Sequence, residues 1–473
     1  MHVTSRQFKD NARGAVADAN LRQSLATMKT GFRAKRGVAV AALPEFEALR
    51  EAGKAMKDHT LAHLDHYLER FEEKVTASGG HVHWAPDADA ACRTVLDICR
   101  RHNARLVTKG KSMVAEEIEL NAFLQKNGIE PVETDLGEYI IQLRHELPSH
   151  IIAPAIHVRK DQVADSFRDT HTQFPADRPL EEPRDLLDEA RTVLRDRFLT
   201  ADVGITGANM LIAETGSTVI VTNEGNGDLT QLLPRVHIVV TSIDKVVPTL
   251  EDSSIVLRLL ARSATGQPMS TYTTFSTGPR RPEDPDGPEH FHVVLLDNGR
   301  SRMLGTQVQD VLRCIRCAAC INHCPIYGAV GGHAYGSVYP GPIGSVLTPG
   351  LASLEEAANL PNASTLCGRC EAVCPMKIPL PRMLRHWREE EFARHLVPAR
   401  ARWGLRLWAF TARRPALYRF GTGLAARALR LLGGRRGRLA RLPLAGGWTR
   451  VRDLPVPEPG GTFMARYKRR ETH

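Results

Sequence analysis

Seven of the nine cysteines fall between Cys314 and Cys374, and their spacing constrains this 473-residue chain more than any other feature. The first motif, Cys-x2-Cys-x2-Cys-x3-Cys-Pro, is made by Cys314, Cys317, Cys320 and Cys324. Three thiolates on a tight turn can reach three irons of one cluster, whereas the fourth, followed by proline, points to a second cluster. A zinc site needs only two such pairs, and an odd number of cysteines does not suit a disulfide framework. The motif therefore predicts iron–sulfur clusters.

A second cysteine motif contains only three thiols. It reads Cys367-x2-Cys370-x3-Cys374-Pro375, and Ser364 occupies the position where a fourth cysteine would begin the pattern. In two-cluster ferredoxins the last cysteine of each motif ligates the cluster of the other motif. That rule gives the first cluster Cys314, Cys317, Cys320 and Cys374. It gives the second cluster Cys324, Cys367 and Cys370, one thiolate short of four.

Three structures are open for the second cluster. It could be a [3Fe–4S] cluster, a [4Fe–4S] cluster in which Ser364 or another group binds the fourth iron, or a [4Fe–4S] cluster whose fourth iron accepts an external ligand. A [4Fe–4S] cluster with one distinct iron is the interpretation we prefer. A turn or helix-capping role competes for the Ser364 hydroxyl.

Strand and helix patterns alternate between residues 80 and 300. Runs of β-branched residues at 218–222 and 236–241 predict strands, whereas 112–127 and 185–198 predict helices. Further strands are expected at 81–85, 105–108, 131–134, 150–153 and 210–213. Alternation of this kind predicts an α/β domain with a mainly parallel sheet.

Together the patterns predict four segments: a helical segment at 1–79, the α/β domain at 80–300, an α-helical ferredoxin domain at 301–395 and an Arg-rich segment at 396–473. The ferredoxin domain is expected to be helical because 308–313 and 380–391, which flank the motifs, have helical patterns. The run 318–354, rich in Gly, Pro and Ser, is predicted to be a loop. With no run of about 18 apolar residues and no secretion signal, we expect a cytoplasmic protein.

Glycine-rich loops in the α/β domain indicate a ligand pocket. The segment 222–228 leaves a predicted strand at its carboxyl end, where open α/β sheets bind ligands. Its backbone amides suit an anion such as phosphate or carboxylate. The candidate pocket residues are Glu214, Glu224, Lys109 and Lys111, with turn and cap roles as the alternative for each glutamate.

The net charge of +10 is concentrated near the C-terminus. From Arg400 onward the chain has 18 lysine and arginine residues against three acidic residues. Arginines beside Trp403, Trp408 and Phe410 suit a helix lying on anionic lipid or a helix packed on protein. Because no nucleic-acid module accompanies the charge, nucleic acid is the least favoured partner.

Long strings of the sequence resemble the lactate utilisation protein B family, whose α/β part is a LUD domain. The strings are 204–237, 111–121, 136–143 and 287–290, together with the cysteine set and the loop 333–342. The resemblance implies a fold similar to sugar isomerases and CoA transferases, and two [4Fe–4S] clusters although the second motif has three cysteines. It implies an iron–sulfur subunit of a three-component L-lactate oxidation system that passes electrons toward the respiratory chain.

On this interpretation lactate loses two electrons at a site on, or shared with, partner subunits, and this chain relays them singly. Because no flavin or nicotinamide fingerprint is present, we do not expect the chain to oxidise lactate alone. One alternative is an iron–sulfur enzyme that acts on a hydroxy acid with its open iron as a Lewis acid. Another is a redox sensor whose basic tail binds a membrane or nucleic acid.

Overall fold

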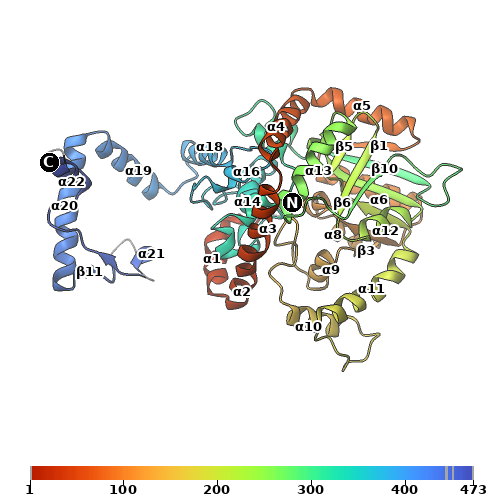
Figure 1. The fold of residues 1–473 in the computed structure, drawn as a ribbon, viewed down its shortest axis with the longest axis horizontal. Helices are drawn as coiled ribbons and strands as arrows, with labels where there is room; N and C mark the ends of the chain where they lie inside the picture. Colours follow the sequence, from red (N-terminus) through yellow and green to blue (C-terminus); the bar gives the residue numbers. More distant parts are fainter. Residues whose placement is uncertain (1–2, 443–445, 450–451, 471–473) are drawn as a thin grey trace. The chain divides into compact units, whose positions relative to one another are not determined.

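The structure is a computed structural model that describes residues 3–442, 446–449 and 452–470. The chain divides into two compact units, 1–390 and 391–473 (Figure 1). Both cysteine motifs and the α/β domain lie in the first unit.

A six-stranded parallel sheet forms the centre of the first unit. Its order is β1-β10-β7-β4-β2-β3, and every neighbouring pair runs parallel. The strands are β1 (His81–Ala85), β2 (Leu106–Gly110), β3 (Glu130–Glu133), β4 (Val203–Thr206), β7 (Val236–Ser242) and β10 (His290–Leu296). The central strands β7 and β10 are almost wholly buried. Strands buried along nearly their whole length are expected where helices cover both faces of a parallel sheet.

Helices cover both faces of this sheet (Figure 1). On one face, α6 (Ala88–Arg101), α7 (Met113–Glu117) and α8 (Leu120–Lys126) share an apolar core with the strands. On the other face, α5 (Leu64–Ala77) contributes Leu64, Leu68, Phe71 and Val75. Cys92 and Cys99 lie on one buried face of α6, which leaves them in the core and apart from the cysteine motifs.

A second, four-stranded sheet has the order β8-β5-β6-β9 and mixed strand directions. Its strands are β5 (Met210–Ile212), β6 (Ser217–Thr222), β8 (Val246–Val247) and β9 (Tyr272–Ser276). Residues of this sheet and of α13 (Leu250–Ala264) share one apolar core with the cysteine segment. The α/β part and the cysteine segment are therefore packed together within the first unit.

The N-terminal helices join the same core. They are α1 (Phe8–Ala17), α2 (Ala19–Met28), α3 (Ala34–Ala41) and α4 (Phe46–Ala62). Arg50 of α4 donates to the carbonyl oxygen of Cys374 at 2.7 Å, and Arg36 of α3 donates to that of Val373 at 2.9 Å. These two helices thus fix the backbone of the second cysteine motif.

The segment 318–354 was predicted to be a loop, and that prediction is wrong. It contains α14 (Ala319–Asn322), α15 (Tyr327–Val330) and α16 (Gly341–Leu351). All but one residue of α16 is buried, including Ile343, Val346 and Leu347. Pro342 occupies its first turn, where proline lacks no needed hydrogen bond. Tertiary burial therefore overrides the low helix propensity of its glycines and prolines.

Two further predictions need correction. The strand expected at 150–153 is absent, and those residues form bends beside the cysteine segment. The helix expected at 112–127 is two helices, because Glu119 adopts a left-handed φ of 58° between α7 and α8. The helix expected at 380–391 is confirmed as α18 (Leu380–Ala393), whereas 308–313 forms only a 3-10 turn at Gln309–Arg313.

The remaining helices of the first unit are α9 (Leu136–Leu143), α10 (Lys160–Thr170), α11 (Pro183–Thr200), α12 (Asn226–Leu232) and α17 (Arg369–Ala372). The second unit contains α19 (Ala399–Ala412), α20 (Pro415–Gly433), α21 (Gly446–Thr449), α22 (Phe463–Arg470) and a small sheet of β11 (Arg438–Leu439) and β12 (Leu454–Pro455). Among the described residues, no helix combines the length and apolar character needed to cross a bilayer.

Candidate iron–sulfur centre and adjoining cavities

Four cysteines line one small cavity. We call Cys314, Cys317, Cys320 and Cys374 the four-sulfur group. Apolar side chains, including Ile151, Ile343 and Ile378, form the rest of the wall. The cavity therefore brings together the thiols that the crossing of the two motifs assigns to one cluster.

The chemistry of the four-sulfur group fits an iron–sulfur cluster. Burial raises the pKa of Cys374 to about 11, and the negative charge of Cys314 adds to it. Burial and the other cysteines also hold the pKa of Cys317 and of Cys320 far above the usual range. Thiols that repel one another as thiolates in a buried cavity suit a bound cationic iron core, because a coordinating metal deprotonates them.

Backbone amides reach two of these sulfurs. The amide of Arg316 lies 3.4 Å from Cys314 Sγ, and that of Ile378 lies 3.5 Å from Cys374 Sγ. The first turn is tight because Arg316 and Ala318 both have a φ of 58°. Amides that donate to cluster sulfurs stabilise the more reduced, more negative state of a cluster.

The other three motif cysteines lie together. We call Cys324, Cys367 and Cys370 the three-sulfur group, because each interacts electrostatically with at least one other member. Cys324 and Cys370 are buried, whereas Cys367 is exposed. The backbone amide of Arg369 and the hydroxyl of Thr365 lower the pKa of the Cys367 thiol. These two hydrogen bonds therefore favour the thiolate form of the exposed Cys367 side chain.

Three hydroxyl groups are relevant to the fourth ligand of this group: Thr365, which interacts with Cys367, Tyr335, which interacts with Cys324, and Ser364, which the sequence pattern suggested. Ser364 Oγ accepts a hydrogen bond of 3.1 Å from the amide of Leu366, which is the role of a turn hydroxyl. Tyr335 Oη is buried, has no acceptor that meets ordinary geometry among the described residues, and lies against the Cys324 thiol. Tyr335 ends a 3-10 turn at His333–Tyr335, between the two cysteine motifs, and Phe8 of α1 packs edge-on against its ring with 5.4 Å between the ring centroids.

A buried ionic network lies beside the four-sulfur group. Arg300, with a fully buried side chain, donates to both carboxylate oxygens of Glu117 at 3.0 and 2.6 Å and to Asp244 at 3.0 Å. Tyr339 Oη donates to Glu117 at 2.7 Å. Arg316 lies over the Tyr339 ring at 5.0 Å and 3.9 Å from Asp244. Although burial opposes it, Arg300 and Arg316 hold the pKa of Asp244 far below its usual value.

A cavity of about 600 Å³ opens where the parallel strands end. We call it the carboxyl-edge cavity, and its wall includes residues that follow β2, β3 and β4, among them Lys111, Asp135 and Gly207. A Cβ at Gly207 would lie 2.5 Å from the carbonyl oxygen of Lys111, so only glycine allows these two loops to approach this closely. The position agrees with the rule that α/β sheets bind ligands at their carboxyl edge.

Two of the four candidate pocket residues line this cavity. Lys111 Nζ contacts Asp135 and lies 3.2 Å from Glu224, which reaches the cavity from the end of β6. Because β6 belongs to the second sheet, Glu224 does not follow a strand of the parallel sheet as the sequence suggested.

The other two candidates have structural partners. Lys109 is fully buried and pairs with Glu116 at 2.6 Å and Glu133 at 2.7 Å. Glu214 accepts a hydrogen bond of 2.9 Å from the amide of Leu250 at the start of α13. Lys109 therefore compensates buried carboxylates, and Glu214 caps a helix.

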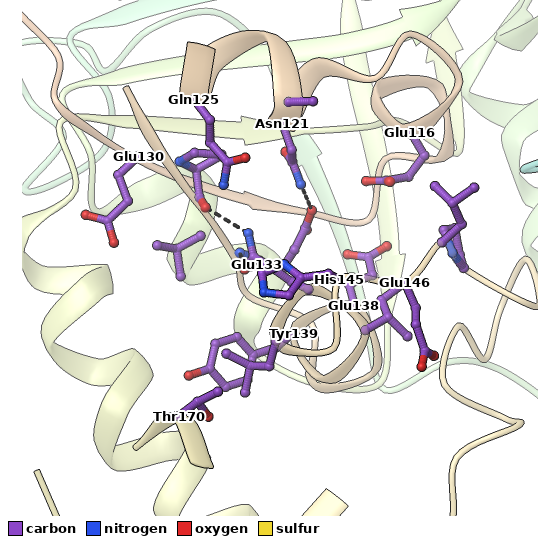
Figure 2. Close-up of a pocket in the computed structure, with 18 of the residues that line it drawn as sticks. Glu116, Asn121, Gln125, Glu130, Glu133, Glu138, Tyr139, His145, Glu146 and Thr170 are labelled. Carbon is purple, nitrogen blue, oxygen red and sulfur yellow. Dashed lines mark hydrogen bonds between the residues drawn. The ribbon is translucent and has the colours of Figure 1, made fainter. Parts of the chain in front are cut away.

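A larger cavity, of about 880 Å³, is lined by carboxylates (Figure 2). Glu116, Glu130, Glu133, Glu138 and Glu146 surround it, and Asn121 donates to Glu133 at 2.6 Å. Burial raises the pKa of Glu133 to about 7. Two cations balance part of this negative charge, since Lys109 pairs with Glu133 and Arg197 pairs with Glu130.

Two residues of the carboxyl-edge cavity were missed from the sequence. Lys245 follows β7 and is 7% exposed, and burial lowers its pKa to about 8. Arg316 lies between the first two cysteines and lines both the carboxyl-edge cavity and the cavity of the four-sulfur group. Arg316 could have been identified from the sequence, because it is a basic residue inside a cluster motif. No local feature of the sequence distinguishes Lys245.

The fold and the sulfur groups define an iron–sulfur protein that combines an α/β domain with a dicluster segment. Known families match accordingly: the LUD domain at 68–296, the 4Fe-4S dicluster domain at 310–378, and the C-terminal part of lactate utilisation protein B at 369–472.

Whole-chain relatives give the same result. The chain is 41% identical over 460 residues to lactate utilization protein B of Bacillus licheniformis, covering 97% of this chain and 95% of that protein. It is 42% identical over 463 residues to the Bacillus pumilus protein of the same name, covering 97% and 96%. It is 41% identical over 474 residues to the Bacillus velezensis protein, covering 100% and 98%. The chain belongs to the lactate utilisation protein B family.

Proposed function

We propose that this chain is the iron–sulfur electron-transfer subunit of an L-lactate oxidation system and holds two [4Fe–4S] clusters. The first would be bound by the four-sulfur group and the second by the three-sulfur group plus one further ligand. The observation that carries the proposal is that the two groups adjoin, because α14, which carries Cys320 and precedes Cys324, packs against α17, which carries Cys370 and precedes Cys374. Membership of a family whose members are named for lactate utilisation supports the substrate.

When bound, the two clusters would accept and release single electrons. The protein's contribution is to hold the sulfurs, shield the first group from water and place cations beside it. Lys57 and Lys245, with Arg316, all interact with Cys314 and favour the more negative, reduced state there. Electrons from lactate would enter from a partner subunit and leave toward a respiratory acceptor.

A hydroxy-acid reaction at an open iron has less support than the relay. It would take place beside the three-sulfur group, whose cysteines do not line the carboxyl-edge cavity or the larger carboxylate-lined cavity. The carboxyl-edge cavity instead adjoins the four-sulfur group, whose irons would all have a cysteine ligand.

The Arg-rich segment, 396–473, supplies a contact surface in this proposal. On α19, Trp403 and Trp408 are 67% and 62% exposed, and Arg406 lies 5.6 Å from the Trp403 ring. Aromatic rings beside arginines suit a membrane surface carrying anionic lipid, which would bring a cytoplasmic carrier to its acceptor. Sedimentation with anionic vesicles but not with neutral vesicles, at low salt, tests this part separately.

The test of the relay is reduction by lactate. The chain is purified without oxygen, and its iron content and EPR spectra are recorded before and after dithionite. About eight irons and a spin-coupled reduced spectrum are expected for two clusters. Reduction by L-lactate should require the partner subunits. Reduction by L-lactate in the purified chain alone would contradict the proposal, as would lack of reduction in the complete system.

A further inference from the structure

Two histidines and a glutamate form a group apart from the motif cysteines. Glu146 and His157 lie in the irregular segment between α9 and α10, and His333 begins the 3-10 turn between the two cysteine motifs. One atom from each residue, a ring nitrogen or a carboxylate oxygen, lies within 4.8 Å of the other two. We call these three residues the His–Glu group. Two imidazoles and one carboxylate form a ligand set typical of zinc and related divalent transition metals.

Each member of the His–Glu group is oriented by a hydrogen bond. Arg144 donates to Glu146 Oε1 at 2.8 Å, and Glu146 Oε2 lies 2.6 Å from His157 Nε2. Although burial opposes it, His157 and Arg144 hold the pKa of Glu146 below its usual value, so this carboxylate is ionised at neutral pH. His333 Nε2 donates to the carbonyl oxygen of Leu147 at 2.7 Å. Partners of this kind orient metal ligands and fix the tautomer of a histidine.

The hydrogen bonds of His157 favour a cation between its ring and Glu146. The Ser149 hydroxyl donates to the carbonyl oxygen of Pro154 at 3.0 Å and lies 2.7 Å from His157 Nδ1, so it accepts from that nitrogen. A neutral His157 then has its lone pair on Nε2, facing a carboxylate oxygen that is also an acceptor. A proton or a metal ion must lie between two such atoms. Burial lowers the pKa of His157, although Glu146 opposes the shift, and therefore disfavours the protonated ring.

A close approach of two backbone segments brings His333 to this group. A Cβ at Gly332 would collide with the carbonyl oxygen of Ser149, so only glycine allows the turn to lie here. Tyr327 Oη donates to the same carbonyl oxygen at 2.8 Å. The ring centroids of His157 and His333 are 4.4 Å apart. The group is therefore held together by the fold before any ion binds.

The charge beside the group also favours a cation. Glu146 lines the larger carboxylate-lined cavity together with Glu133 and Glu138 (Figure 2). Burial, together with the charges of Glu133 and Asp135, raises the pKa of Glu138. Carboxylates that interact in this way create a negative potential, which attracts a divalent cation to the wall of the cavity.

We propose that the His–Glu group binds one Zn²⁺ ion, with Glu146, His157 and His333 as its protein ligands. Three protein ligands leave the fourth position of a tetrahedral zinc ion to water. The ion joins the segment after α9 to the turn that ends at Tyr335, whose hydroxyl interacts with Cys324. Because none of the ligands is a cysteine, the inference does not rest on the electron relay.

The test is zinc binding to the full iron-loaded chain, purified without oxygen and treated with a weak chelator. Calorimetry and metal analysis should give one zinc per chain with the iron unchanged, and no binding of Mg²⁺ at the same concentration, because Mg²⁺ prefers oxygen ligands. His333→Gln and Glu146→Gln should each weaken zinc binding at least about a hundredfold, since loss of even an outer partner of a metal ligand costs about 10–100-fold. Zinc affinity should fall as the pH is lowered, because protons compete for both histidines.

His145→Asn is the matched control. His145 is the exposed neighbour of Glu146, lines the same cavity and is not a member of the His–Glu group. Its φ of 53° is left-handed, which asparagine tolerates, so zinc binding should not change. Equal iron content and equal circular dichroism establish that each variant is folded.

Four results would overturn the inference: no zinc on the parent chain, zinc uptake matched by loss of iron, parent-like zinc affinity in His333→Gln and Glu146→Gln, or an equal loss of affinity in His145→Asn. The second result would place the zinc in the sulfur groups. The relay is judged separately, by reduction with L-lactate and the partner subunits. A chain that is reduced in this way but binds no zinc loses only the His–Glu site, and a chain that binds zinc but is never reduced loses only the relay.

Discussion

The four-sulfur group and the three-sulfur group differ in how completely the protein supplies what a cluster needs. The first has four cysteines, one for each iron of the proposed cluster, with an apolar enclosure and cations that interact with its sulfurs. The second has one cysteine fewer, an exposed thiol at Cys367 and a buried hydroxyl at Tyr335. The comparison shows that crossed motifs do not make equivalent sites. One site is enclosed and has four cysteines, and the other is partly exposed and has three.

Loss of a cysteine from the four-sulfur group should have the largest effect. We expect Cys320→Ala to abolish the first cluster and reduce iron from about eight to about four atoms per chain or fewer. Iron analysis and EPR measure the loss. The control is Cys99→Ala, which removes a buried thiol of α6 and should keep all the iron at a cost of about 1 kcal/mol. Full iron retention in Cys320→Ala would remove the assignment of this group.

The second largest effect is expected from breaking the ionic network beside the four-sulfur group. Arg300→Gln leaves Glu117 and Asp244 without their main partner, which should lower the free energy of unfolding by about 3–5 kcal/mol. Anaerobic urea unfolding of the iron-loaded chain measures it. The exposed pair of Arg197 and Glu130 provides the control, because Arg197→Gln should cost less than about 1 kcal/mol. Similar losses in the two variants would show that the network is not a stabilising feature.

Iron should leave the three-sulfur group first when a chelator and a mild oxidant are added. Cys367 is exposed, whereas three members of the four-sulfur group are buried. We therefore expect two phases of about four irons each, with Cys367 the first thiol to become reactive to iodoacetamide. Mass mapping of the labelled thiols, timed against the EPR signals, identifies the order. Loss of all the iron in one phase, or labelling of Cys317 before Cys367, would contradict the expected difference in accessibility between the two sulfur groups.

Removing the hydroxyl of Tyr335 should affect the second cluster alone. Tyr335→Phe keeps the ring against Phe8 but deletes a donor beside Cys324, so the reduction potential of the second cluster should fall by about 60 mV, a tenfold change for one electron. Redox titration followed by EPR measures both clusters in one sample. Tyr339→Phe, beside Arg316, is the matched control because it should leave the second cluster unchanged.

The smallest effect is expected at Ser364. Its hydroxyl accepts from the Leu366 amide, so Ser364→Ala should retain all the iron and lose about 0.5–2 kcal/mol of stability, as for a capping hydroxyl. Iron content and the EPR line shape show whether the second cluster is intact in this variant. A drop of one iron per chain, with a signal in the oxidised state, would instead make Ser364 the fourth ligand.

The sequence predicted the parts of this molecule that depend on local spacing. The cysteine intervals separated the two sulfur groups, and β-branched runs located β6 and β7. It failed where distant segments decide the structure. The helix α16 forms from a glycine- and proline-rich run only because the surrounding core buries it.

The candidate site divides in the same way. Lys111 and Glu224 were marked by the loops that carry them, and both reach the carboxyl-edge cavity. The buried ionic network was not predictable, because Arg300 donates to Glu117 across 183 positions of the sequence and also to Asp244. Lys245 can be assigned to the cavity only from the structure, in which the chain after β7 places it on the same wall as Arg316.

The strand order has a consequence for the synthesis of the chain. Among the described residues, the edge strand β1 pairs with β10 alone, so His292, the partner of His81, is synthesised more than two hundred residues later. Until the ribosome has made β10, the apolar face of α5 has no complete sheet to cover. Cys374, which closes the four-sulfur group, leaves the ribosome later still. The proposed first cluster can therefore be completed only after Cys374 has been synthesised, and only then can Arg50 of α4 donate its hydrogen bond to the Cys374 backbone.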